Sequence, residues 1–240
     1  MPHAIGFSLD QPAPRLLVSV RDTREAVEAA GAGADLVDAK DPDEGALGSL
    51  APDTVRAITL AVGGRACVSA VAGEAAGLGD LVTRIRVTAA CGVGMVKVAL
   101  SPALAADPDL ERLAGALGAL GTPTVAVLFA EDGPRTEWLP NLALAGFAGA
   151  MIDTRGKAGL RLTDHLTLSA LTDFVMACRR LGLLSGLAGS LTLDDIPRLS
   201  GCGPSYLGFR GGLSVGSDRR GRLDPARVSE ARRRLAPVAA

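Results

Sequence analysis

Three lysines are the residues of this chain best suited to covalent chemistry. Lysine is rare here: of the 25 lysine and arginine residues, only Lys40, Lys97 and Lys157 are lysines. Each lies at or just after a short apolar run typical of a β-strand. An amine, unlike a guanidinium, can lose its proton near neutral pH and attack a carbonyl carbon. The sequence therefore favours lysine-based carbonyl chemistry over the alternative of three structural ion pairs.

Two aspartates accompany these lysines. Asp38 precedes Lys40 by two residues, so both side chains point to the same side of an extended strand. Asp153 ends the apolar run ahead of Lys157. Several cations in a partly dry pocket lower the pKa of one amine, which can then add to an aldehyde or ketone and form a Schiff base. Asp38 and Asp153 are suitable proton shuttles for such a reaction.

Glycine-rich segments follow the last two apolar runs and point to phosphate. The first contains Gly189 and Ser190, and the second contains Arg210, Gly211 and Gly212. Small residues let backbone N–H groups approach an anion, a helix after Ser190 adds its dipole, and Arg210 adds a full charge. Glycines also form ordinary turns, so either segment alone is a weak indication. Both segments at the ends of two successive strands predict a phosphate site.

Eight apolar runs alternate with helix-like segments, and these elements must position the reactive side chains. The alternation predicts an α/β fold, a single (β/α)₈ TIM barrel over residues 15–240 behind a loose leader at residues 1–14. An open doubly wound sheet is the alternative, but no GxGxxG turn follows the first strand. The expected strands are 15–20, 36–40, 66–71, 95–100, 124–129, 148–153, 183–188 and 206–210. The expected helices are 24–30, one starting near 52, 78–91, 109–120, 136–145, 165–181, 192–199 and 225–235.

Composition excludes several classes of function. A formal net charge of −1 lacks the basic field that nucleic acid or an anionic membrane requires. No apolar run approaches the ~20 residues of a membrane span. The four cysteines lie far apart, and residues 1–14 lack the apolar core of a signal peptide, so we expect a cytoplasmic protein with reduced thiols. We expect no cofactor and no metal, because lysine chemistry requires neither.

Other candidate residues are expected to have structural roles. The acids at residues 41–44 are of the kind that ligates Mg²⁺, but loop acids are usually solvated. His165 is expected to cap a helix, and Ser190 lacks His and Asp partners in the order of a hydrolase triad. The arginine-rich runs at 219–222 and 232–234 are expected to form solvated surface, with a local phosphate or subunit contact as the alternative.

Taken together, these motifs closely resemble the (5-formylfuran-3-yl)methyl phosphate synthase family, also called 4-(hydroxymethyl)-2-furancarboxaldehyde-phosphate synthases. The resemblance runs in order from the first strand to beyond the eighth. It combines an Asp-x-Lys strand, an Asp-Thr-x-x-Lys loop and an Ala-Gly-Ser segment. The matching motifs are Leu16–Ser19, Gly33–Pro42 with Glu44 to Gly48, Val96–Val98, Met151–Thr154 with Lys157, Asp164–Leu166, Leu187–Ser190, Asp195–Pro197 and Gly208–Gly211.

The resemblance implies a lyase that condenses two molecules of glyceraldehyde 3-phosphate into a phosphorylated furan aldehyde, with loss of phosphate and water, for methanofuran or methylofuran biosynthesis. By the same resemblance Lys40 is the Schiff-base lysine. Its acid/base and phosphate-positioning companions are Asp38, Lys97, Asp153 and Lys157. The chain departs from the family at Ala39, in the leader, and at residues 211–214, which lack a cysteine expected in archaeal members.

Two other functions are compatible with the sequence. One is a class I aldolase that acts on another phosphosugar, and the other is a barrel that binds phosphorylated metabolites or a partner without catalysis. Analysis of the product formed from triose phosphate separates the first from the furan synthase. Dispensable lysines would favour the second. The oligomeric state stays open, since the Ala-rich segment at 110–120 is compatible with a homo-oligomer contact but is also typical of barrel helices.

Overall fold

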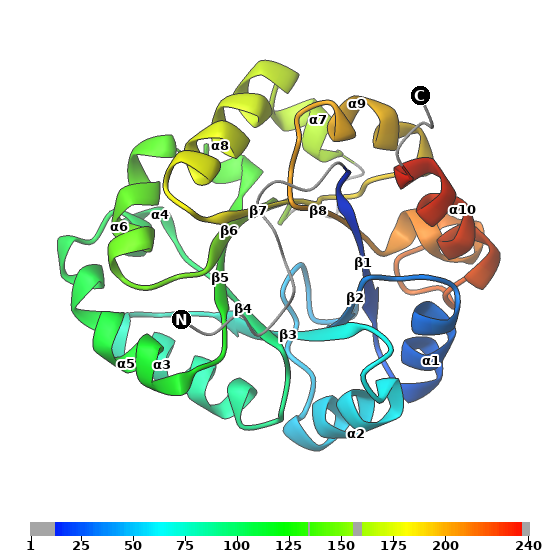
Figure 1. The fold of residues 1–240 in the computed structure, drawn as a ribbon, viewed down its shortest axis with the longest axis horizontal. Coiled ribbons are helices and arrows are strands. Elements are labelled where there is room, and N and C mark those ends of the chain that lie inside the picture. The colour runs from blue at the N-terminus through cyan, green and yellow to red at the C-terminus, as the bar shows by residue number, and fades with distance from the viewer. Residues whose placement is uncertain (1–12, 134, 156–159, 237–240) are drawn as a thin grey trace.

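Eight parallel strands form a closed barrel with helices around it (Figure 1). The computed structural model describes residues 13–133, 135–155 and 160–236. The strands are β1 (Arg15–Val20), β2 (Leu36–Ala39), β3 (Cys67–Glu74), β4 (Met95–Ala99), β5 (Thr124–Phe129), β6 (Gly149–Asp153), β7 (Leu184–Leu187) and β8 (Tyr206–Phe209). Each strand pairs with its neighbours in chain order, and β1 pairs with β8 to close the barrel. The predicted (β/α)₈ fold is confirmed.

The connections between strands are helical. The α-helices are α1 (Thr23–Gly31), α2 (Pro52–Val62), α3 (Leu78–Ala89), α4 (Pro102–Ala105), α5 (Ala114–Leu120), α6 (Leu139–Leu144), α7 (Leu162–His165), α8 (Leu168–Arg180), α9 (Ile196–Ser200) and α10 (Pro225–Leu235). Short 3₁₀ segments are η1 (Pro108–Leu113), η2 (Ala130–Asp132), η3 (Thr136–Trp138), η4 (Leu193–Asp195), η5 (Gly211–Leu213) and η6 (Val215–Ser217). Side-chain caps start several of them, as at α1, where Asp22 accepts a hydrogen bond from the backbone N–H of Glu25.

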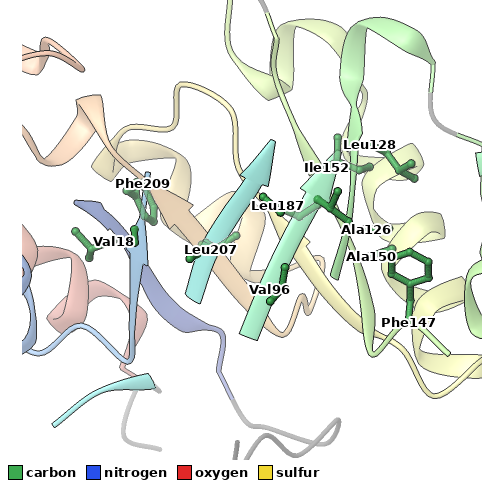
Figure 2. Packing of buried hydrophobic residues seen from close by; sticks show 14 of the residues in the cluster. Val18, Val96, Ala126, Leu128, Phe147, Ala150, Ile152, Leu187, Leu207 and Phe209 are labelled. Carbon is green, nitrogen blue, oxygen red and sulfur yellow. The ribbon is translucent and has the colours of Figure 1, made fainter. Parts of the chain in front are cut away.

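The strands are apolar on both faces because each face is covered. One face packs against the helices, and Figure 2 shows part of this layer, including Val18, Ala126 and Leu207. The other face fills the barrel interior with a second cluster that includes Leu17, Met95 and Tyr206. Both clusters are almost entirely buried, as expected for a parallel barrel whose strands contribute alternate side chains to the two layers.

Four of the expected helices are broken in the structure, and one of them, expected at 192–199, begins as η4 and continues as α9. The segment expected at 109–120 begins as η1 and continues as α5, and the segment at 136–145 begins as η3 and continues as α6. The segment expected at 165–181 divides into α7 and α8 because Leu166 is extended and the Thr167 hydroxyl accepts the N–H of Ala170, which starts a new helix. A cap or a 3₁₀ turn thus sets each of these helix boundaries, although the apolar periodicity continues across it.

Of the predicted leader at residues 1–14, only the last two residues lie within the described ranges. No helix among the described residues is long and apolar enough to cross a bilayer. The carboxyl ends of all eight strands face the same end of the barrel, and the loops that follow them form one rim.

Candidate active site

A cavity of about 430 Å³ lies at the carboxyl ends of the strands. Two of the three lysines, Lys40 and Lys97, line it together with Asp153. The five residues predicted to bind phosphate line it as well: Gly189, Ser190, Arg210, Gly211 and Gly212. Asp38 lies outside this lining, and Lys157 lies outside the described residues. The topology therefore brings most of the sequence-predicted residues into one cavity.

Lys97 is a buried amine held by a buried carboxylate. Its Nζ lies 2.6 Å from Oδ2 of Asp38, and the two residues are 1% and 0% exposed. Asp38 also accepts hydrogen bonds from the hydroxyls of Ser69 at 2.7 Å and Ser19 at 3.1 Å. Burial lowers the pKa of Lys97, and the charge of Lys40 adds to this, although Asp38 acts in the opposite direction. The amine is therefore disposed to exchange a proton.

The pairing register of strands β1 to β4 brings the side chains around Asp38 and Lys97 together. Ser19 on β1 pairs with Asp38 on β2, which pairs with Ser69 on β3. Val71, two residues beyond Ser69 and on the same face, pairs with Lys97 on β4. Four inward side chains of four successive strands thus lie at neighbouring levels of the barrel, and hydroxyls flank the carboxylate on both sides.

Lys40 forms its ion pair with a carboxylate on a distant strand, that of Asp153 at the end of β6. Its Nζ lies 3.5 Å from Oδ2 of Asp153, while Oδ1 of Asp153 accepts the N–H of Thr154 at 2.8 Å. Among the described residues, Asp38 therefore forms its ion pair with Lys97 and not with Lys40, its neighbour two residues along the chain. Asp38 pairs with Lys97 and Asp153 with Lys40, because inward side chains of a closed barrel meet across its interior.

The glycine-rich segments after β7 and β8 form a backbone cradle. Gly189 and Ser190 both have positive φ values, 117° and 51°, and among the described residues no acceptor takes their N–H groups. A Cβ at Gly212 would lie 2.2 Å from the carbonyl oxygen of Leu191, so only glycine lets the two loops meet. Two adjacent N–H groups without acceptors at the rim of a cavity are suited to an anion.

Arg210, predicted to bind phosphate, uses its guanidinium in contacts with the protein itself. Its guanidinium makes a buried ion pair with Glu25, with contacts of 2.5 and 3.1 Å. Its remaining N–H groups donate to the backbone carbonyls of Ser19, Arg219 and Gly221. All five N–H groups of the side chain are thereby used. A phosphate contact of Arg210, which stays a prediction, would have to replace one of these hydrogen bonds.

Two further arginines, which sequence reasoning did not place in the site, line the cavity: Arg161 and Arg219. Arg161 precedes α7 and makes a 3.4 Å ion pair with Asp195. Arg219 belongs to the run expected to form solvated surface, yet it is only partly exposed. Its place after the Gly-rich end of β8 is the only sequence signal that pointed to the site. Among the described residues, no three His, Cys, Asp or Glu side chains come together as a metal site.

Comparison with known proteins supports a family assignment. The model of the 4-HFC-P synthase family matches residues 16–232. A Methylorubrum extorquens protein provisionally named (5-formylfuran-3-yl)methyl phosphate synthase is 52% identical over 93% of this chain and 92% of its own length. The proteins of that name from Methanococcus maripaludis strain C5 and Methanopyrus kandleri are 32% and 34% identical, over 90% and 86% of this chain and 96% and 92% of theirs.

Solved structures match the fold. Phosphoribosyl anthranilate isomerase from Thermus thermophilus gives a TM-score of 0.65 at 15% identity, over 92% of this chain and 98% of the other. A 3-hexulose-6-phosphate synthase also gives 0.65, at 18% identity, over 92% of this chain and all of the other. At these low sequence identities, the two matches support the fold and not a function. Because the family model spans nearly the whole barrel and relatives above 30% identity cover it, the chain belongs to the 4-HFC-P synthase family.

Proposed function

We propose that this protein condenses two molecules of glyceraldehyde 3-phosphate into (5-formylfuran-3-yl)methyl phosphate through a Schiff base on Lys40. The atoms balance when one phosphate and two waters leave. The observation that carries the proposal is the convergence of two amines and a carboxylate in one cavity, with one amine buried and its pKa lowered. We further propose that residues 15–240 form a single catalytic domain, with methylofuran or methanofuran synthesis as the use of the product.

Lys40 is the proposed nucleophile because its amine reaches the cavity and has an acid beside it. The nitrogen lone pair adds to the carbonyl carbon of one triose, and the resulting carbinolamine loses water to give the imine. Asp153, 3.5 Å from Nζ of Lys40, takes a proton from the Lys40 ammonium before the attack and gives it to the hydroxyl group that leaves as water. Loss of a proton next to the imine then gives an enamine, whose carbon attacks the aldehyde of the second triose.

Lys97 is the proposed acceptor for that proton. Burial favours its uncharged form, and an uncharged amine in the cavity wall can take a proton and return it later to the leaving phosphate or water. Asp38 accepts a hydrogen bond from Nζ of Lys97 and does not line the cavity, so its proposed role is to position this amine. For Lys157, the family resemblance alone supports the proposed role as an acid/base or phosphate-positioning companion of Lys40.

The cradle after β7 and β8 is the proposed site of one substrate phosphate. The unused N–H groups of Gly189 and Ser190 support this, as does the place of the cradle after the last two strands, where such barrels frequently bind phosphate. Gly211 and Gly212 contribute the close approach of the second loop. The guanidinium of Arg210 would join this contact only by giving up one of its hydrogen bonds to the protein.

The experiment supplies glyceraldehyde 3-phosphate alone and follows the near-ultraviolet absorbance of a furan, with mass spectrometry of the product. In parallel, borohydride is added during turnover and the protein is digested to map the reduced adduct. We expect an adduct on Lys40 that Lys40→Arg abolishes, together with the furan, while the charge and the fold are kept.

Other outcomes would reassign the function. An adduct on Lys97 would move the nucleophile and keep the reaction class. An aldol product without a furan would favour a class I aldolase on another phosphosugar. Full activity of Lys40→Arg, with no adduct in the wild type, would refute lysine catalysis and favour a barrel that only binds phosphorylated metabolites.

A further inference from the structure

Arg219 is a cation in the cavity wall that has no anionic partner among the described residues. Two other arginines after β8 have carboxylate partners: Arg210 forms an ion pair with Glu25, and Arg220 forms one with Asp43. Arg219 lines the cavity, and no described carboxylate lies within ion-pair distance of its guanidinium. A guanidinium stays protonated in proteins, so this is a permanent charge beside the proposed substrate.

The hydrogen bonds of Arg219 are also incomplete. Its Nη2 donates to the carbonyl oxygen of Gly45 at 2.5 Å, while its Nε is buried and has no acceptor. Burial lowers the pKa of Arg219, partly offset by the nearby charge of Asp153. An unpaired, half-buried guanidinium destabilises the empty site, because its lost hydration is not replaced by protein contacts. An anion that enters the cavity would restore that balance.

The surrounding loop holds Arg219 in this place. The Arg210 guanidinium binds the carbonyl oxygens of Arg219 and Gly221, at 2.8 and 3.0 Å. A Cβ at Gly221 would lie 2.9 Å from the carbonyl oxygen of Val215, so the loop is tightly folded on itself. Arg210 is therefore the positioning residue of a second arginine.

Arg219 reaches from the loop after β8 to the loop after β2. Its backbone N–H lies beside Gly211 of the cradle, 3.4 Å from where a Cβ of that glycine would be. Its Nη2 reaches the carbonyl of Gly45 in the loop that follows Lys40. The charge thus lies between the cradle after β8 and the loop after β2, which carries the nucleophile.

We propose that Arg219 binds the phosphate of the second triose, at an anion subsite separate from the cradle of Gly189, Ser190, Gly211 and Gly212. The inference rests on the proposed function: two phosphorylated substrates meet in one cavity, and a single backbone cradle accommodates one phosphate group. A guanidinium fork suits a phosphate because it presents two parallel N–H donors to two oxygens.

The test separates the two half-reactions in Arg219→Gln and in the matched control Arg220→Gln, whose side chain is exposed and outside the cavity lining. Borohydride trapping at varied glyceraldehyde 3-phosphate reports capture of the first triose on Lys40. Furan formation reports use of the second. For Arg219→Gln we expect unchanged trapping and a concentration requirement for furan formation raised roughly 10- to 100-fold, the range of a charge-assisted hydrogen bond. Arg219→Lys should recover part of the loss, and Arg220→Gln should match the wild type in both assays.

Each other result counts against the inference. Equal losses in trapping and furan formation, with a lowered melting temperature, would make Arg219 a structural tie to Gly45. No change in either assay would remove it from the site. If the wild type forms no furan at all, the proposed function fails by itself. Calorimetric titration with inorganic phosphate then decides the inference: two equivalents bound by the wild type and one by Arg219→Gln support it, and equal stoichiometry overturns it.

Discussion

The two carboxylates of the proposed site, Asp38 and Asp153, have different surroundings, which suit them to different proposed roles. Asp38 is fully buried and accepts three donors, so its charge is satisfied and its position fixed. Asp153 lines the cavity and faces Lys40 at the longer distance of 3.5 Å. A carboxylate with every oxygen occupied orients its neighbour, whereas one that meets the cavity can exchange a proton with a ligand.

Asp38→Asn tests the positioning role through the pH dependence of the rate. The carboxylate is the main influence that raises the pKa of Lys97 against burial, so its removal lowers that pKa further. A lower pKa leaves more uncharged amine at a given pH, and the acid limb of the pH–rate profile should move to lower pH. The measurement is kcat/KM for furan formation across pH, with the exposed surface variant Asp53→Asn as control. An acid limb that stays in place would show that Lys97 is not the group that titrates.

At the scale of residues, the sequence predicted which side chains come together in one cavity but not how they pair. The scarcity of lysine and the strand-end positions of Lys40 and Lys97 brought both into the same predicted site. The pairing of Lys40 with Asp153 joins residues 113 positions apart, and no local spacing encodes such a contact. The different surroundings of Arg210 and Arg219 were likewise not predictable, because both are arginines near glycines, and only Arg210 meets the buried Glu25.

At the scale of elements, the loops after β7 and β8 pack tightly against each other. Gly212 is packed against the carbonyl of Leu191, and Gly189 is packed against Thr154 after β6, where a Cβ would lie 2.6 Å from its methyl carbon. Three consecutive strand ends are therefore in backbone contact. This contact fixes the distance between the unused N–H groups and the rest of the cavity wall.

Gly212→Ala should separate these loops. The new methyl group would meet a backbone carbonyl that cannot rotate away, so we expect overpacking to cost about 1–3 kcal/mol of unfolding free energy and to weaken inhibition by inorganic phosphate. Gly115→Ala is the matched control, because it adds a methyl group to α5 with no atom within 4 Å. Helix propensity makes that change neutral or stabilising by up to about 1 kcal/mol. The measurements are urea denaturation and phosphate inhibition of furan formation; unchanged inhibition would exclude this pair of loops as the cradle.

Elements were the most predictable level of this structure. All eight strands were recovered because each is a short apolar run with turn residues on both sides, and repetition made the number of strands secure. The helix interruptions at Leu166 and before Leu139 were missed, since a threonine cap or a 3₁₀ turn leaves the apolar spacing nearly unchanged. The tight contact at Gly212 was also beyond reach, because the glycine itself does not reveal which backbone it meets.

At the scale of the whole molecule, one ion pair joins the beginning and the end of the barrel. Glu25 lies on α1 and Arg210 directly after β8, and the carboxylate also accepts the N–H groups of Arg21 and Leu223. Burial alone would raise the pKa of Glu25, but the Arg210 guanidinium and these N–H groups hold it below its usual value of 4.5.

Glu25→Gln should therefore destabilise the barrel in a pH-dependent way. Above pH 4.5 both folded and unfolded wild-type chains carry the charge, and the full contribution is present; it is lost as the pH falls through the lower folded pKa. We expect a loss of about 3–5 kcal/mol at pH 7, typical for breaking a buried pair, and a smaller difference from the wild type at lower pH. Denaturant unfolding at the two pH values measures this. The exposed helix pair of Arg56 with Asp53 gives the control, because Asp53→Asn should cost less than about 1 kcal/mol at either pH. A pH-independent difference would contradict the electrostatic account.

The same junction has a consequence for how the enzyme matures. During translation, β8 is the last strand to emerge, and it and the arginine-bearing loop that follows it pack against β1 and α1, which emerge first. Lys40 and Lys97 are thus synthesised long before the loops after β7 and β8 that line the same cavity. The cavity is complete only when the first and last strands have paired.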